Sequence, residues 1–128
     1  MAVEFAPDFA VRAMREIIVA LVRRDGPALS AHQLGVFLTC YLQDGDHTVR
    51  SLAKELSVSK SVITRALDRL GELNLTLRRT DPFDARSVIV DRTPTGLAML
   101  ADLRQIAVNF SNRSQDVMVR ESERIITP

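Results

Sequence analysis

The sequence predicts a mainly α-helical protein with one small β-hairpin. Most of the chain repeats apolar residues at the three- and four-residue spacing of amphipathic helices. Alternation typical of strands is confined to about residues 75–92. The length of 128 residues suits a single domain, 1–128, that can bury a core without a disulfide or metal. Cys40 is the one cysteine, which favours a reducing, cytoplasmic setting.

Two helices are expected before residue 44. Residues 8–24 carry apolar side chains at helical spacing, and Asp25-Gly26-Pro27 ends that helix. Ser30 and Gln33 have the spacing of a capping box, in which each side chain bonds the other residue's backbone N–H. They open a second helix, whose expected buried stripe is Leu34, Phe37, Leu38, Tyr41 and Leu42.

Residues 48–73 are expected to form two short helices joined by a three-residue turn, a helix-turn-helix. Thr48 can cap the first helix, and Ser59 can cap the second. The expected inward face of the second helix is Val62, Ile63, Ala66, Leu67, Leu70 and Leu73. Its expected outward face is Lys60, Ser61, Thr64, Arg65, Asp68 and Arg69. These outward groups can bond phosphates and base edges in a major groove about 12 Å wide.

A charged hairpin follows, with strands expected at about 75–80 and 86–92. Leu75 and Leu77 alternate with polar residues, so we expect both leucines to face inward. Asp81-Pro82 starts the turn. A basic hairpin directly after a helix-turn-helix is a wing, whose tip can lie along the minor groove, where arginine is favoured. We expect Asp84 to pair with Arg86 or another arginine and hold the tip in shape.

A long helix is expected from about 94 to 126. Thr93 can cap it, with Pro94 in the first turn. Its predicted inward face is Leu97, Leu100, Leu103, Ala107 and Phe110. The terminal helices, about 8–24 and 94–126, hold more apolar surface than one small body needs, including Phe5, Phe9, Met14, Ile18 and Phe110. Because helix-turn-helix proteins pair two half-sites, we expect these helices to form a homodimer.

Charge is unevenly distributed although the net charge is only +1. Residues 48–92 hold nine bases and six acids, whereas the rest of the chain holds eight bases and ten acids. A basic middle between acidic ends favours a polyanionic partner, here double-stranded DNA, with 48–92 as the binding region. The expected DNA-binding residues are Ser59, Lys60, Ser61, Thr64, Arg65, Arg69, Arg78, Arg79, Asp84 and Arg86.

Taken together, these motifs resemble the MarR family of winged-helix transcription regulators. The matching segments are Ser30-Ala31-His32-Gln33, TVRSLAKELSVSKSVITRALDRL, Leu75 with Arg78 and Arg79, the wing motif Asp81-Pro82-Phe83-Asp84-Ala85-Arg86, and Thr93-Pro94-Thr95-Gly96. The resemblance implies a homodimer with interlocked terminal helices that binds a pseudo-palindromic operator, often as a repressor. It also implies a small-molecule effector that lowers DNA affinity.

By position, the resemblance assigns Ser59, Lys60, Ser61, Thr64 and Arg65 to the major groove and Arg86 to the minor groove. The sequence departs from the family pattern at three places. Asn74 stands where the family usually has glycine, and Asn tolerates a left-handed backbone. Arg92 stands where the family usually has leucine, so we expect a looser corner before the last helix. The short C-terminal region is expected to trim the dimer interface or remodel it around Val117, Met118, Ile125 and Ile126.

Enzymes and metal proteins are not favoured. The sequence has no Ser/His/Asp arrangement, no glycine-rich phosphate loop and no clustered carboxylate pair. His32, His47 and Cys40 lack metal-ligand spacing, so we expect no metal and no cofactor. Cys40 lies in an apolar helix with no adjacent base, where a thiol is usually inert to oxidants. His32 is interpreted as a helix-start residue or as part of a ligand pocket.

No signal peptide is expected, because the N-terminal residues show no basic region followed by a long apolar run. No membrane partner is expected, because no stretch approaches the roughly 18 apolar residues of a membrane helix. Two alternatives to a transcription regulator remain open. One is a winged-helix module that binds another protein, which predicts little affinity for duplex DNA. The other is a replication-origin-binding protein, which predicts binding to iterated repeats instead of a palindrome.

Overall fold

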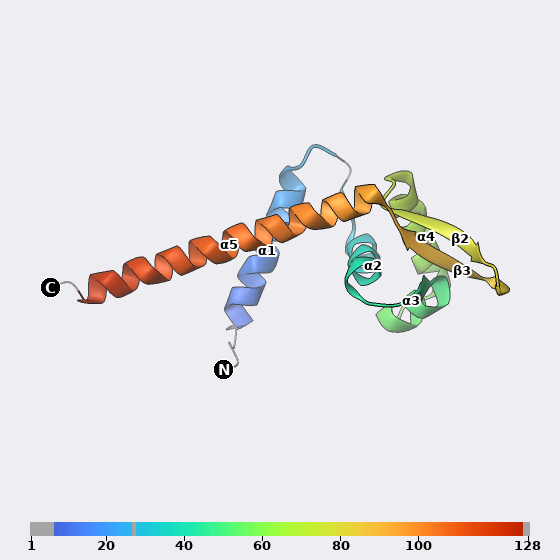
Figure 1. Ribbon diagram of the computed structural model, residues 1–128, viewed down its shortest axis with the longest axis horizontal. Helices are drawn as coiled ribbons and strands as arrows, with labels where there is room; N and C mark the ends of the chain where they lie inside the picture. The colour runs from blue at the N-terminus through green and yellow to red at the C-terminus, as the bar shows by residue number, and fades with distance from the viewer. Residues whose placement is uncertain (1–6, 27, 127–128) are drawn as a thin grey trace. The chain divides into compact units, whose positions relative to one another are not determined.

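The computed structural model describes residues 7–26 and 28–126, with side chains as far as residue 116 (Figure 1). Phe5 and the side chains of Val117, Met118, Ile125 and Ile126, which we expected at a dimer interface, lie outside this part. The elements are α1 (Pro7–Arg23), α2 (Ala31–Leu42), β1 (His47–Thr48), α3 (Val49–Leu56), α4 (Lys60–Glu72), β2 (Thr76–Asp81), β3 (Asp84–Arg92) and α5 (Pro94–Ile126). The predicted mainly helical winged fold is confirmed.

The chain divides into two compact units. The winged unit is Leu29–Leu100, and it contains α2, α3, α4, the whole sheet and the start of α5. The terminal unit contains α1 and the part of α5 that follows Leu100. Each unit is described separately below.

The helices of the winged unit begin at the residues that their capping side chains predict. The Ser30 side chain accepts from the N–H of Gln33 (3.2 Å), and the Gln33 side chain accepts from the N–H of Ser30 (2.9 Å). Thr48 forms a second reciprocal box with Ser51. Ser59 Oγ accepts from the N–H of Val62 (3.3 Å). Each cap satisfies backbone donors that have no partner inside the helix, so local sequence sets these boundaries.

The core of the winged unit is built around α4, which packs against α2 and α3. Four residues of the predicted inward face of α4 are buried, namely Ile63, Ala66, Leu67 and Leu70, whereas Val62 and Leu73 at its edges are half-buried. In α2, Phe37 and Tyr41 are buried as predicted, but Val36 and Cys40 complete the buried stripe, while Leu34 and Leu38 are only half-buried. Leu42, which we expected inside, is 54% exposed. Residues three and four apart share a helix face, and α2 turns the 36/37/40/41 face inward.

A three-stranded antiparallel sheet, in the order β1-β3-β2, forms the wing and its base. The two-residue strand β1 was not predicted, and it pairs His47 with Val90 and Thr48 with Ile89. The expected inward position of Leu77 is wrong: Leu77 is 57% exposed, whereas Thr76 is fully buried. The strand begins at Thr76, and successive side chains alternate between faces, so burying Thr76 turns Leu77 outward.

One buried hydroxyl joins three parts of the winged unit. Tyr41 Oη of α2 donates to the carbonyl oxygen of Leu75 (2.7 Å) and accepts from the N–H of Thr93 (2.9 Å). Thr93 Oγ1 donates to the carbonyl oxygen of Asn74 (2.7 Å) and accepts from the N–H of Gly96 (3.0 Å), which confirms Thr93 as the cap of α5. The start of β2, the end of β3 and the start of α5 are therefore fixed on α2.

Arg92 tightens this corner, contrary to the expectation that it loosens it. Its Nε donates to the carbonyl oxygen of Cys40 (2.8 Å), and its guanidinium lies 5.6 Å from the centroid of the Tyr41 ring. A guanidinium over an aromatic face is attracted by the ring quadrupole. Asn74 adopts the left-handed conformation, with φ of 57°, as an asparagine can.

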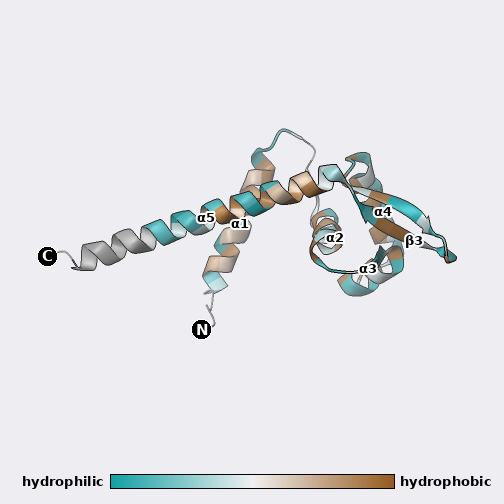
Figure 2. Cartoon of the chain, in the orientation of Figure 1, coloured by the Kyte–Doolittle hydropathy of each residue, from teal (hydrophilic) through white to brown (hydrophobic). Residues whose placement is uncertain are grey.

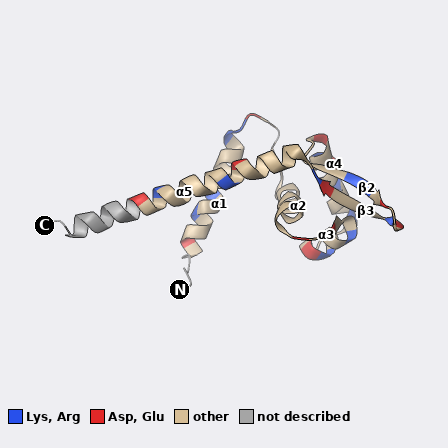
Figure 3. Ribbon diagram, viewed as in Figure 1, with Lys and Arg blue, Asp and Glu red and all other residues tan. Residues whose placement is uncertain are grey.

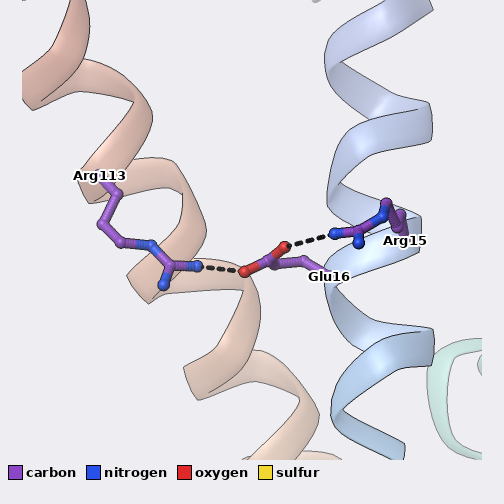
Figure 4. A network of polar contacts seen from close by, with 3 residues as sticks. All are labelled: Arg15, Glu16 and Arg113. Carbon is purple, nitrogen blue, oxygen red and sulfur yellow. Dashed lines mark hydrogen bonds and ion pairs between the residues drawn. The ribbon is translucent and has the colours of Figure 1, made fainter. Parts of the chain in front are cut away.

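In the terminal unit, α1 has no buried residue and carries an apolar stripe. The stripe consists of Val11, Met14, Ile18 and Val22, which are 42–77% exposed and recur at the spacing of one helix face. Apolar colour recurs along α1 in Figure 2. Within this unit Glu16 accepts from Arg113 (2.5 Å) and lies 3.7 Å from Arg15 (Figure 4). On α5, Leu100 and Leu103 are buried as predicted, but Leu97 is 52% exposed.

Within the described part of the chain, none of the helices combines the length and apolar character needed to span a membrane.

We expect Gly96→Ala to destabilise the protein strongly. A Cβ at this position would overlap the Tyr41 hydroxyl and stand 2.6 Å from the Leu75 carbonyl oxygen. Overpacking of this kind costs about 1–3 kcal/mol of unfolding free energy, measurable by urea denaturation. Gly35→Ala is the matched control, because its Cβ would meet only Leu56 Cδ2 at 3.9 Å. Because alanine favours helix more than glycine does, Gly35→Ala should leave the unfolding free energy unchanged or raise it. Equal unfolding midpoints for the two variants would contradict the packing argument.

Thr76→Val should raise the unfolding free energy by about 1 kcal/mol. Thr76 Oγ1 is buried and has no hydrogen-bond partner among the described residues, so its desolvation is not compensated. Valine replaces this hydroxyl by a methyl group and keeps the β-branched shape. Thr80→Val, at an exposed site of the same strand, is the control and should change little. A destabilised Thr76→Val protein would show that the hydroxyl is in fact hydrogen-bonded.

Candidate nucleic-acid interface

The outward face of α4 presents the polar side chains that the sequence predicts. Because Ile63 and Leu67 point into the core, Lys60, Thr64 and Arg65 are turned to solvent. Ser59 Oγ lies 3.0 Å from Ser61 Oγ, so the cap and its neighbour form one hydroxyl pair at the start of the helix. Among the described residues, neither Lys60 nor Arg65 has an acidic partner. Both charges are therefore available to a phosphate.

Three of the predicted arginines are paired with acids. The pairs are Arg69 with Glu72 (3.0 Å), Arg78 with Asp68 (2.6 Å) and Arg79 with Asp91 (2.7 Å). The second pair links β2 to α4, so it orients the wing relative to the exposed helix face. Exposed pairs of this kind add only about 0–1 kcal/mol of stability. Their main effect is to direct these side chains and to offset part of their charge.

The wing tip is a two-residue turn, Pro82-Phe83, closed by the facing residues Asp81 and Asp84. Asp81 Oδ1 accepts from the N–H of Phe83 (2.9 Å), and Asp84 Oδ1 accepts from the N–H of Arg86 (3.0 Å). The prediction that Asp84 pairs with an arginine side chain is wrong, because the carboxylate bonds the backbone of Arg86 instead. It still shapes the tip, and the guanidinium of Arg86 has no acidic partner among the described residues.

All ten predicted site residues lie in the winged unit, on α4, on the residue before it, or on the wing. Nine of them are exposed, and Arg69 is half-buried. Figure 3 marks basic positions in blue and acidic positions in red, and both kinds occur on the hairpin of β2 and β3. The structure therefore sorts the six predicted cations of this surface into free ones, which have no acidic partner among the described residues (Lys60, Arg65 and Arg86), and paired ones (Arg69, Arg78 and Arg79).

Two features of this surface were missed at the level of sequence. Arg50 and Lys54 of α3 are exposed and have no acidic partner among the described residues. The first helix of a helix-turn-helix crosses the DNA backbone, so the basic residues of α3 could have been predicted from the sequence as phosphate contacts. Phe83 is 97% exposed at the wing tip. Phe83 could have been noticed in the sequence as an aromatic residue inside a turn that otherwise holds only small or polar groups.

A shallow hollow of about 240 Å³ lies between the start of α2 and the first turns of α4. Its lining residues are Ser30, His32, Gln33, Val62, Arg65 and Ala66. This volume is below the roughly 300–1,000 Å³ of typical ligand pockets. His32 is thus both a helix-start residue and part of a hollow, and the hollow places it beside Arg65.

Cys40 is poorly suited to react with oxidants. The side chain is buried, and this burial raises the pKa of the thiol to about 11, although the nearby charge of Arg92 lowers it in part. Thiolate is the reactive form, so little of it is present near neutral pH. The described residues contain no group of three or more His, Cys, Asp or Glu side chains placed to hold a metal ion.

Comparison with known proteins gives a consistent result. Residues 29–88 match the model of the MarR family. Among curated proteins, no sequence matches the chain. The solved structures include the transcriptional regulator Tm0710 of Thermotoga maritima, with a TM-score of 0.68, 23% identity, and coverage of 91% of this chain and 86% of that one.

Two further structures share the fold. One is a mutant MarR of E. coli in complex with operator DNA, with a TM-score of 0.61, 22% identity, and coverage of 94% of this chain and 89% of that one. The other is BpsR of Bordetella bronchiseptica, described by the regulation of its DNA binding by 6-hydroxynicotinic acid. Its TM-score is 0.57, with 19% identity and coverage of 98% of this chain and 95% of that one.

We expect the Cys40 thiol to react very slowly with iodoacetamide in the native protein below about pH 9, because its pKa is raised to about 11. In urea, where the thiol is solvated, alkylation should be fast at the same pH. The raised pKa also means that the native state holds this proton more tightly, so its stabilising contribution is lost as pH rises from about 9 to 11. Equal alkylation rates in the two states, followed by mass spectrometry, would contradict this picture.

Proposed function

We propose that this protein, whose residues 29–88 match the model of the MarR family, is a sequence-specific, DNA-binding transcription regulator. In this proposal the cytoplasmic protein binds a pseudo-palindromic operator as a homodimer. The observation that carries the proposal is the set of free cations on α4 and at the wing tip, on the two elements that a winged helix offers to the grooves of a duplex. The winged-helix fold it shares with a regulator solved on operator DNA supports the same function.

The contacts follow from the chemistry of each group. Lys60 and Arg65 can reach guanine acceptors or phosphates in the major groove. Ser59, Ser61 and Thr64 hydroxyls, together with the N–H groups at the start of α4, suit phosphate oxygens. Arg86 suits the minor groove, where the negative potential favours arginine. Because Arg69, Arg78 and Arg79 are held by acids, we assign them a smaller share of the affinity and a role in orienting the wing.

The apolar stripe of α1 supports a homodimer. Val11, Met14, Ile18 and Val22 leave apolar surface in water on a helix that buries none of its own residues in the chain. Apolar patches of this kind mark interaction sites. We propose that α1 and α5, residues about 8–24 and 94–126, form the dimer interface. Two copies would present two winged units to two half-sites, which is what a palindrome requires.

We extend the proposal to a repressor whose DNA affinity is controlled by a small molecule. The support is the family resemblance and the shared fold with BpsR, whose DNA binding is regulated by 6-hydroxynicotinic acid. No metal, cofactor or catalytic step is part of the proposed mechanism.

The test is selection of a duplex from a random-sequence library by the purified protein, followed by fluorescence anisotropy at several salt concentrations. We expect enrichment of an inverted repeat and binding that weakens steeply with salt. Lys60→Ala, Arg65→Ala and Arg86→Ala should each reduce the slope of log K against log salt by about one for each phosphate left without its cation, or about two per dimer. Arg79→Ala is the matched control, since Asp91 already offsets its charge.

Other outcomes favour the other functions. A protein that enriches no sequence and binds all duplexes weakly would be a protein-interaction module. Enrichment of direct, iterated repeats would point to origin binding. Equal slope changes for Arg79→Ala and Arg86→Ala would contradict the division into free and paired cations.

A further inference from the structure

Phe83 is the most exposed of the large apolar residues in the described part of the chain. It is 97% exposed, whereas the next such residue, Val22, is 77% exposed. It stands at the tip of the winged unit's hairpin, in the turn between β2 and β3. Burying a phenylalanine side chain is strongly stabilising, and the exposed ring of Phe83 adds none of this free energy to the folded protein.

The turn that carries Phe83 is structured. Its backbone N–H donates to Asp81 Oδ1 (2.9 Å), and the preceding Pro82 fixes its own φ. The facing pair Asp81 and Asp84 closes the turn, and the second carboxylate accepts from the N–H of Arg86. The ring is therefore presented by a preorganised backbone, which lowers the entropic cost when the ring binds a partner.

The tip combines this ring with a free cation. Arg86 follows three residues later, where the register of the two strands shifts between Thr80 and Asp81. Such irregularities re-aim side chains at the end of a ladder. The tip also holds two carboxylates, of Asp81 and Asp84, which offset part of the attraction that Arg86 exerts on a duplex. Phe83 can add a contribution to DNA binding that does not depend on charge.

We propose that Phe83 binds DNA directly, and that its ring packs against the deoxyribose walls of the minor groove beside Arg86. Minor-groove proteins combine arginine with apolar side chains such as phenylalanine, which they insert between base steps. The ring of Phe83 would contact the groove from its sugar walls instead. The inference rests on the proposed function, because it requires the wing to lie on a duplex. It adds an uncharged anchor to an interface otherwise made of cations and hydroxyls.

Salt dependence separates this anchor from a charged one. On the duplex selected by the wild-type protein, Phe83→Ala should lower affinity about tenfold per dimer, with the slope of log K against log salt unchanged. Arg86→Ala should lower affinity and make the slope shallower. Phe83→Leu, which keeps an apolar side chain, should retain most of the affinity. Leu77→Ala is the matched control, because Leu77 is an exposed apolar residue of the same hairpin but faces Asp91 away from the tip.

Thermal unfolding should be the same for Phe83→Ala and the wild type, since the ring is solvated in the free protein. Wild-type affinity in Phe83→Ala, with Arg86→Ala weakened, would overturn this inference and leave the proposed function intact. A shallower salt slope for Phe83→Ala would also overturn it, because an uncharged group releases no counterions. If the wild-type protein selects no duplex, the proposed function and the inference fail together.

Discussion

The Tyr41 hydroxyl is the interaction on which the geometry of the winged unit depends. It donates to Leu75 and accepts from Thr93, so one buried group holds the base of the wing and the start of α5 on α2. A buried hydroxyl with both bonds made costs little, and one without them is destabilising. The same close approach leaves no room for a side chain at position 96. Arg92 adds its bond to the carbonyl oxygen of Cys40 at this corner, which ties the end of β3 to α2.

Ion pairs determine which positive charges remain available on the surface of the winged unit. The ion pair between Arg78 and Asp68 joins the wing to α4, and the pairs of Arg69 and Arg79 remove two more arginines from the free set. Lys60, Arg65 and Arg86 keep charges that a polyanion can neutralise. Counting the nine bases of residues 48–92 therefore overstates the attraction, because ion pairs decide which charges are available.

The two units meet different requirements. The winged unit buries a core of its own, in which Phe37, Leu52, Ile63 and Leu67 are nearly inaccessible to solvent. By contrast, α1 buries none of its residues and keeps its apolar stripe exposed. An exposed stripe of this kind is what the proposed homodimer would bury. Specific recognition by paired winged units and burial of this stripe would then be achieved by the same association.

Local chemistry by itself determined where the helices start and which face of α4 is buried, because caps and helical periodicity act over three or four residues. Ser30, Thr48, Ser59 and Thr93 all cap as the sequence predicts. Only the tertiary structure decided which side chains of β2 face the core and that His47 and Thr48 form the strand β1. It also decided the contacts of Arg92 and the pairing of Arg78 with Asp68. Those features depend on contacts between residues far apart in the chain. Thr76 is buried and Leu77 exposed because strand pairing, not hydropathy, sets which side of an alternating strand faces the core.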